Sequence, residues 1–115
     1  MEYSLQQTDQ AIEDVSSMAV YMALQLSNQK AATDFIDTYG KQLRLIQTFP
    51  FACREIHFHY DGQPVRKKSF LTYHIFYIID DSLQLITILR VLKNRQNWQR
   101  FFIIQSGNST TFIQE

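Results

Sequence analysis

The sequence is poor in cysteine, glycine and proline, with one, three and two of these residues in a chain of 115. The single cysteine, Cys53, has no second cysteine with which to form an internal disulfide or a zinc site, which fits a reducing compartment. With three glycines there is no glycine-rich phosphate loop, and no Gly-x-Ser-x-Gly nucleophile motif occurs either. The most easily recognised classes of enzyme are therefore not indicated.

Long apolar segments are absent as well. No uncharged run reaches the roughly 18 residues of a membrane-spanning helix. The first ten residues, MEYSLQQTDQ, do not combine a positive start with an apolar block, so a secretory signal peptide is not expected. We therefore expect no membrane association and a cytoplasmic location.

The chain also lacks net charge, because its eleven basic and eleven acidic side chains sum to zero. A protein that coats nucleic acid through bulk electrostatics is usually strongly basic, so this mode is disfavoured. Residues 1–40 nevertheless carry six acids and one base, whereas residues 66–100 carry seven bases and two acids. This asymmetry indicates either a polar contact on the C-terminal half or a solvated charged face.

Two stretches of the N-terminal half show the periodicity of amphipathic helices. After a short strand over residues 3–6, Thr8 or Asp9 can cap a first helix, and Ser27 or Asn28 can cap a second, which ends at Pro50. The apolar positions of the first are Ile12, Val15, Ala19, Met22, Ala23 and Leu26, and those of the second are Ala31, Ala32, Phe35, Ile36, Tyr39, Leu43 and Ile46.

Beyond Pro50 the apolar period changes to the two-residue alternation of strands. Residues 56–60 alternate, and Asp61-Gly62 predicts a tight hairpin turn. The next strand, residues 70–79, is apolar on both faces and should be central, and residues 80–82 reverse the chain into a strand over residues 83–92. The predicted fold class is α+β, with two N-terminal helices packed on a three- to four-stranded antiparallel sheet. We expect one domain over residues 1–100 and a C-terminal tail over residues 101–115.

Candidate metal ligands are sparse. His57 and His59 lie two residues apart on one strand face, but a zinc site needs three or four ligands, and no others have a recognisable spacing. Asp80 and Asp81 are read as turn formers rather than as a catalytic carboxylate pair. We therefore expect no metal and no cofactor.

A group of cations near aromatic residues is the strongest chemical signal. If residues 66–68 enter the central strand and residues 90–95 leave its antiparallel neighbour, the two groups meet at one edge of the sheet. Guanidinium groups pair well with phosphates, and an imidazole or phenol could share protons during cleavage of RNA by its 2′-hydroxyl. Solvated cations beside buried aromatic side chains remain the alternative. The six cations concerned are Arg66, Lys67, Lys68, Arg90, Lys93 and Arg95.

Several short patterns, in this order, resemble the RelE/ParE superfamily of type II toxins. They are Ala11-x-x-Asp14-Val15, Tyr21, Ala31-Ala32, Phe49-Pro50, Arg66, Tyr73-x-Ile75-x-Tyr77 and ILRVLKNR, and they span about residues 2–98. The resemblance implies a β-α-α-β-β-β fold and a bacterial toxin without a cofactor. It also implies a cognate antitoxin that neutralises the toxin, in a complex that binds operator DNA through the antitoxin.

The resemblance leaves two modes of action open. ParE-like members inhibit DNA gyrase, and here the implied target contacts are Arg90, Lys93, Arg95 and Trp98. RelE-like members cleave mRNA on the ribosome, and the residues implied for that reaction are Arg66, Lys67, His74, Arg90 and Arg95. The segment from Ile88 to Leu92 resembles the final ParE strand, and His74 stands where RelE-like chains carry arginine, so gyrase is favoured. A non-toxic binding module with the same fold is the third hypothesis.

Overall fold

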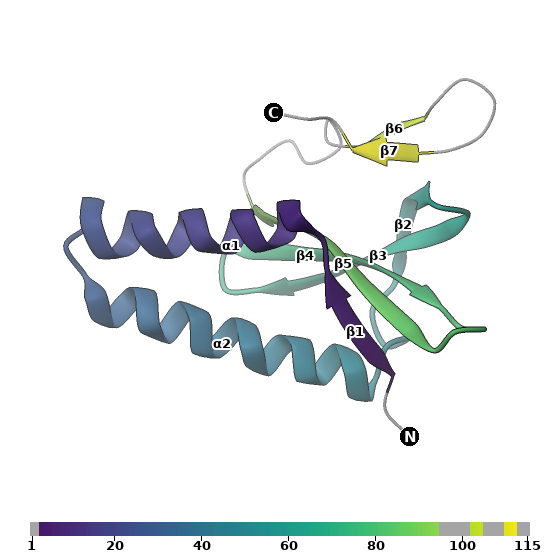
Figure 1. Cartoon of the computed structure of the whole chain (residues 1–115), viewed down its shortest axis with the longest axis horizontal. Coiled ribbons are helices and arrows are strands. Elements are labelled where there is room, and N and C mark those ends of the chain that lie inside the picture. The colour runs from purple at the N-terminus through teal and green to yellow at the C-terminus, as the bar shows by residue number, and fades with distance from the viewer. Residues whose placement is uncertain (1–2, 95–101, 105–109, 113–115) are drawn as a thin grey trace.

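The computed structural model describes residues 3–94, 102–104 and 110–112. The N-terminal half contains β1 (Ser4–Gln7), α1 (Asp9–Val20), the π-helical turn η1 (Tyr21–Gln25) and α2 (Gln29–Thr48). Four strands follow, β2 (Glu55–Tyr60), β3 (Gln63–Phe70), β4 (Tyr73–Asp80) and β5 (Leu85–Lys93), and then β6 (Phe102–Ile104) and β7 (Thr110–Phe112). Figure 1 shows the two helices running antiparallel beside the sheet.

Both helices begin where the sequence predicts a cap. The hydroxyl of Thr8 accepts a hydrogen bond from the Ala11 amide at 3.1 Å, and the side chain of Asn28 accepts one from the Ala31 amide at 2.9 Å. These bonds satisfy amide groups that a first helical turn leaves unpaired. The first helix differs from expectation at its end, because it changes from α to π geometry at Tyr21.

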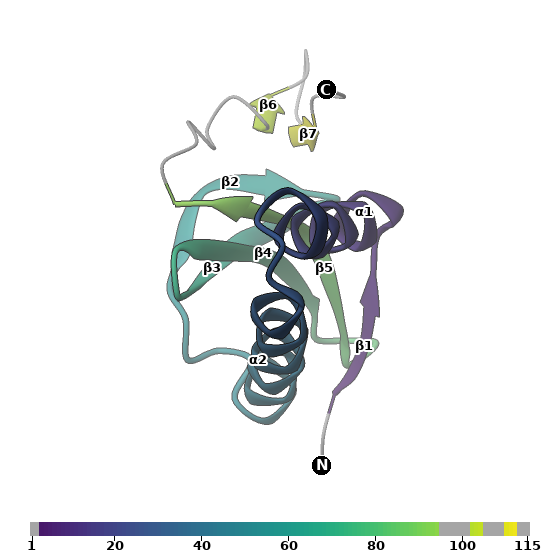
Figure 2. The same ribbon diagram turned by 90° about the vertical axis from the view of Figure 1, so that its left-hand side faces the viewer.

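Five strands form one mixed sheet in the order β1-β5-β4-β3-β2. The predicted α+β class is confirmed, with β4 at the centre. The sheet differs from the prediction in having five strands where three to four were expected, and in being mixed where an antiparallel sheet was expected. β1 pairs parallel to β5, with Gln7 opposite Ile88. The connection between these two parallel strands is long and contains both helices and strands β2 to β4, and the helices lead the chain from β1 to β2 at the other edge of the sheet. In Figure 2, which looks along the helices, β1 and β2 lie at opposite edges.

The extra strand arises because the chain reverses at Leu71-Thr72. This turn was not predicted, since neither residue is a typical turn former. Leu71 adopts a left-handed conformation with φ of 50°, and the antiparallel pairing of β3 with β4 ends at Phe70 and Tyr73. Residues 66–68 consequently lie inside β3 instead of at the entrance to the central strand. The turn at Asp61-Gly62 is as predicted, with φ of 55° and 78°.

The main core lies between the helices and one face of the sheet. Buried side chains of α1 and α2 pack there against alternate residues of β4 and β5, and this face is called the helix face below. Among its members are Val15, Phe35, Tyr39, Tyr77 and Ile88. The four buried residues of α2 all lie on its predicted apolar face, but Ile36 on that face is 43% exposed, and Ile12 on the predicted face of α1 is 49% exposed.

The opposite face of the sheet carries a second apolar cluster, and we call it the outer face. Val65, Phe76, Ile78, Leu89 and Leu92 are buried there, with apolar side chains of β2 packed against them. β6 and β7 pair antiparallel, and β7 lies next to β2 (Figure 2). In the part of the chain that the structure describes, no helix is long and apolar enough to cross a membrane.

Candidate target-binding site

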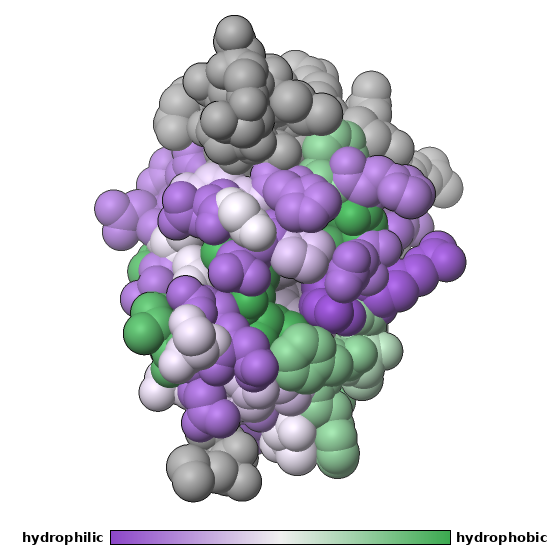
Figure 3. Space-filling model, turned by 90° about the vertical axis from the view of Figure 1, so that its right-hand side faces the viewer, coloured by the Kyte–Doolittle hydropathy of each residue, from purple (hydrophilic) through white to green (hydrophobic). Residues whose placement is uncertain are grey.

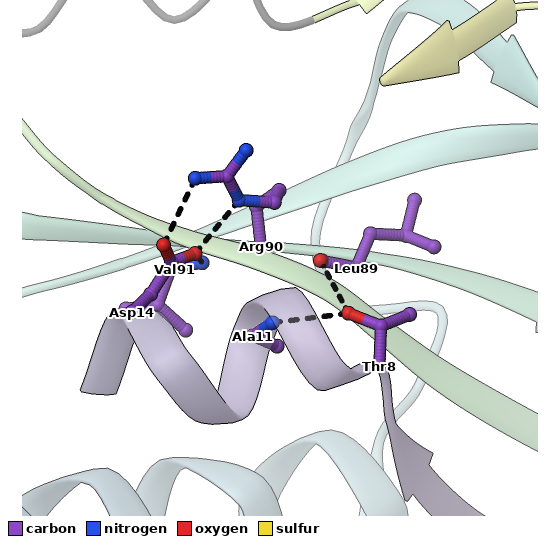
Figure 4. A network of polar contacts seen from close by, with 6 residues as sticks. All are labelled: Thr8, Ala11, Asp14, Leu89, Arg90 and Val91. Atoms are coloured by element: carbon purple, nitrogen blue, oxygen red, sulfur yellow. Dashed lines mark hydrogen bonds and ion pairs between the residues drawn. The ribbon is translucent and has the colours of Figure 1, made fainter. Parts of the chain in front are cut away.

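Arg90, one of the predicted site residues, is held by the carboxylate of Asp14. Its Nε and Nη2 atoms donate to Asp14 at 2.8 and 2.9 Å, and the Val91 amide donates to the same carboxylate at 2.9 Å (Figure 4). The Arg90 and Asp14 side chains are only 9% and 13% exposed. The pairing of β1 with β5 ends at Ile88, so on that side of β5 the Val91 amide has no strand to bond to. The Asp14 carboxylate accepts its hydrogen bond instead.

The position of Arg90 depends on an irregularity in β5. Phe76 pairs with Arg90 and Tyr77 with Ile88, so Leu89 is an extra residue in the ladder. Simple alternation from Ile88, which points to the helix face, would put Arg90 on that face too. The bulge turns it onto the outer face, in one row with Phe76 and Lys67.

His74 lies on the outer face as well. The Ser69 hydroxyl is 2.8 Å from its Nδ1 atom. Burial and the neighbouring charge of Lys67 lower the pKa of His74, while a hydrogen bond with the Asn94 side chain acts in the opposite direction. The imidazole is therefore neutral at pH 7. Of the residues implied for RNA cleavage, Lys67, His74 and Arg90 thus share one face of the sheet.

Arg66 and Lys68 lie on the other face, so the single cationic edge predicted from the sequence is wrong for these two residues. Arg66 is paired with Tyr77 and Lys68 with Ile75, and both partners belong to the helix face. Side-chain direction alternates along a strand, and residues 66–68 form part of β3, which divides them between faces.

Arg66 has structural partners near the end of α2. Its guanidinium donates to the Cys53 carbonyl at 2.5 Å and to Glu55 at 3.1 Å, and it lies 5.1 Å from the centre of the Phe51 ring. Phe51 is exposed, as are Leu45 and Phe49, which line one shallow hollow near the end of α2. Figure 3 views the side on which α2 ends and β4 turns into β5, and apolar side chains gather in its lower half.

Lys93, a predicted target contact, is exposed at the last position of β5. Its ammonium lies 5.4 Å from the centre of the Tyr21 ring, close enough for a cation-π interaction. Both residues line a groove of about 750 Å³ at the tip of the helical hairpin. We call it the tip groove; its walls include Met18, Tyr21, Met22, Leu26, Tyr73 and Lys93. Arg95 and Trp98, the other predicted target contacts, lie outside the described residues.

Within the described residues, no group of three histidine, cysteine, aspartate or glutamate side chains is placed to hold a metal ion. His57 and His59 are exposed on β2. Tyr39 and Tyr77 are buried phenols, and burial raises the pKa of each. Both donate hydrogen bonds within the core, Tyr39 to Gln7 at 2.7 Å and Tyr77 to the Pro50 carbonyl at 2.8 Å.

Three residues have contacts in this region that the sequence did not predict, and Asp14 is one of them although it belongs to the motif Ala11-x-x-Asp14-Val15. Asp14 lies 76 positions before its partner Arg90, and nothing in a helical pattern marks a polar residue that reaches a strand. Ser69 and Asn94, the neighbours of His74, follow from the turn at Leu71-Thr72, which was itself missed.

Known families and structures agree with this architecture. Residues 5–98 match the family model of the ParE toxin of the type II toxin-antitoxin system parDE. The chromosomal ParDE toxin-antitoxin system of P. aeruginosa contains a chain of the same fold, with 17% identity, a TM-score of 0.62 and coverage of 79% of this chain and 95% of that one.

A second solved structure of the same fold is the toxin-antitoxin complex RelBE2 from Mycobacterium tuberculosis. It has 17% identity and a TM-score of 0.54, with 81% of this chain and 99% of that chain covered. No curated protein sequence matches the chain. Because the family model covers most of the sequence, the chain belongs to the ParE toxin family of type II toxin-antitoxin systems.

Proposed function

We propose that this toxin arrests growth by binding DNA gyrase through Lys93 at the end of β5, together with Arg95 and Trp98 as predicted from the sequence, while Arg90, the fourth predicted contact, positions the end of β5. The observation that carries the proposal is the position of Lys93, which is exposed beside apolar side chains at an end of the sheet. A cation next to an apolar groove suits a protein surface, because aromatic and apolar side chains dominate the energetics of protein interfaces. The family model points the same way.

The state of Arg90 adds support. A guanidinium that already holds a buried carboxylate is costly to release, since its partner would be left as an uncompensated charge. Clamping the phosphate of an RNA would require that release or a second partner for the same side chain. In the gyrase model, Arg90 acts mainly by fixing the end of β5 relative to α1.

Ribosome-dependent cleavage of mRNA is the second candidate, and one observation favours it. Lys67, His74 and Arg90 lie on one face in three adjacent strands, and His74 is neutral at pH 7 and so could accept a proton. Arg66 does not belong to that set, because it lies on the helix face.

The test is induction of the toxin in bacteria, followed by parallel pulse labelling of DNA and protein synthesis. Early loss of DNA synthesis with DNA-damage signalling is expected for gyrase inhibition. Early loss of translation with cut mRNA would replace the proposal by the second candidate. Normal growth while soluble toxin accumulates would favour a non-toxic binding module.

The family match supports a proposal for the cellular setting. We propose a cytoplasmic toxin whose cognate antitoxin is encoded beside it, in a complex that binds operator DNA through the antitoxin. Co-expression of the neighbouring gene product should restore growth. Purification of the tagged toxin from those cells should yield a stable complex of the two proteins.

A further inference from the structure

The side of the molecule on which α2 ends and β4 turns into β5 carries two features that complement each other (Figure 3). The first is the shallow hollow near the end of α2, of about 120 Å³, whose lining includes Leu45, Phe49, Cys53 and Lys68. Leu45 and Phe49 are 45% and 61% exposed, so apolar surface faces the solvent here. A cavity of about 150 Å³ holds a benzene ring. The hollow is therefore of a size for one apolar side chain.

The surroundings of this hollow are basic. From residue 38 to residue 54 the chain has three basic residues and no acidic one. Arg44 and Arg54 are exposed, and Lys68 lines the hollow from β3. Within the described residues, neither Arg44 nor Lys68 takes part in an ion pair. An apolar side chain flanked by carboxylates would therefore match the hollow in shape and in charge.

The second feature is the turn between β4 and β5, which presents an exposed leucine beside two carboxylates. Leu83 is 68% exposed and follows Asp80, Asp81 and Ser82 in the chain. The Asp80 carboxylate accepts hydrogen bonds from the Ser82 hydroxyl at 2.7 Å and from the Leu83 amide at 3.2 Å. These bonds fix the turn, so little conformational freedom is lost when Leu83 enters a pocket.

The end of α2 and the β4–β5 turn adjoin through Tyr3. The Tyr3 hydroxyl donates a hydrogen bond to Asp81 at 2.5 Å, and its ring meets the Phe51 ring edge to face, with the centres 6.2 Å apart. Phe51 itself is 52% exposed. Because both features lie on one side of the molecule, a two-fold axis beside them can bring the turn of each copy to the hollow of the other.

A nucleic-acid strand fits this surface less well, although cations beside aromatic rings also bind single strands. The chain has no net charge, whereas binding to nucleic acid usually requires a basic domain. One face of the Phe51 ring is already covered by the Arg66 guanidinium, at 5.1 Å. The β4–β5 turn, in contrast, combines the apolar side chain and the carboxylates that the hollow requires.

We propose that a second copy of this chain docks on this side, in a two-fold symmetric dimer in which Leu83 of each copy fills the hollow beside Leu45 and Phe49 of the other. The carboxylates of each turn then face the basic side chains around the hollow. This inference does not depend on the proposed function. The twenty residues of α2 span about 30 Å, so the interface lies at the far end of this helix from the tip groove. The dimer therefore leaves Lys93 of both copies uncovered and carries two target contacts.

The first test is the mass of the full-length protein in solution. Light scattering and sedimentation should show a concentration-dependent particle of twice 13.6 kDa. Leu83→Arg and Leu45→Arg should each raise the Kd of the dimer about tenfold or more, as the loss of an interface anchor does. Leu24→Arg is the matched control; Leu24 is 71% exposed in η1, at the other end of α2, and its Kd should change by less than about twofold.

Circular dichroism and the unfolding midpoint check that each variant is folded. A protein that stays monomeric at all concentrations would overturn the proposal. A dimer that neither Leu83→Arg nor Leu45→Arg weakens would overturn it as well.

The single cysteine allows a test that does not depend on a loss of affinity. Cys53 lines the hollow and is a free thiol. With oxidised glutathione as the oxidant, the thiol introduced by Leu83→Cys should form a disulfide with Cys53 of the second copy, seen as a covalent dimer on a non-reducing gel. Peptide mapping should place the bond between positions 53 and 83, and Leu24→Cys should not link to Cys53. A bond between the two introduced thiols, or no covalent dimer, would contradict this geometry.

The antitoxin is the alternative occupant of the hollow. Leu45→Arg should leave the affinity for the protein encoded beside the toxin unchanged within about twofold, measured by calorimetric titration. A loss of that affinity while the Kd of the dimer is unchanged would assign the hollow to the antitoxin and overturn the proposal.

Discussion

At the scale of single residues, the best-defined feature is the carboxylate of Asp14. It receives two donors from Arg90 and one from the Val91 amide, and it lies on the side of β5 away from β4, beyond the end of β1. The same carboxylate therefore completes a backbone ladder and neutralises a buried guanidinium. A single substitution removes both effects at once.

Asp14→Ala should lower the free energy of unfolding by about 3 kcal/mol, because breaking a buried ion pair leaves an uncompensated charge. Asp34→Ala is the control. Asp34 pairs with Lys30 at 2.7 Å on the exposed face of α2, where such pairs contribute at most about 1 kcal/mol. Urea denaturation of the two variants measures the difference. Equal effects would show that the Asp14 pair does not clamp α1 to β5.

His74 should make stability dependent on pH. Because its folded-state pKa is lowered below the ordinary 6.5, folding favours the neutral imidazole. The corresponding stability is present above the unfolded-state pKa and is lost as the pH falls below about 6.5. We expect His74→Gln to reduce the difference in unfolding free energy between pH 7.5 and pH 5.5, measured in urea. An unchanged difference in the His74→Gln variant would contradict this role of His74.

At the scale of elements, local sequence determines where the helices begin, whereas tertiary packing determines one of the turns. Thr8 and Asn28 fix the helix starts through side-chain bonds to amides three residues on, and this depends on nothing distant. The turn at Leu71-Thr72 is different. A leucine rarely adopts positive φ, so pairing of β3 with β4 imposes the conformation, and the sequence carries no signal for it.

Helix α2 contains a correctable weak position, Gly40. An added Cβ there would meet only the Arg44 Nη1 atom, at 3.9 Å, which is ordinary contact with a flexible side chain. Gly40→Ala should therefore stabilise the protein by about 0.5 to 1 kcal/mol. Thermal unfolding should show a higher midpoint.

Gly62→Ala is the contrasting substitution. Gly62 has φ of 78° in the β2–β3 turn. An alanine there would be strained by this backbone conformation, although no atom lies within 4 Å of the added Cβ. Its unfolding midpoint should fall. A rise for both variants, or a fall for both, would contradict the assignment of these two backbone conformations.

At the scale of the whole molecule, the two faces of the sheet separate the candidate modes of action. Lys93 points to the same side as Tyr73, on the helix face, whereas Lys67 pairs with Phe76 on the outer face. The gyrase proposal uses the first of these lysines, and RNA cleavage would use the second. The same charge change at each position can therefore distinguish them.

Lys93→Glu should weaken growth arrest by about tenfold or more in the inducer concentration required, since reversing a charge at a contact opposes binding. Lys67→Glu should leave growth arrest nearly unchanged. Immunoblotting controls for the amount of each toxin. The reverse result, with arrest lost only in Lys67→Glu, would move the target site to the outer face and favour RNA cleavage.

The sequence by itself determined the α+β class, the helix caps, the central position of β4 and the family. Periodicity, capping residues and the order of motifs can all be read along the chain without knowing which distant segments meet. Only the tertiary structure decided which cations act together. A change of one residue in register moves a side chain to the opposite face, so the bulge at Leu89 and the turn at Leu71-Thr72 set the positions of Arg90 and Arg66. The pairing of Asp14 with Arg90 and the tip groove likewise exist only once distant segments have met.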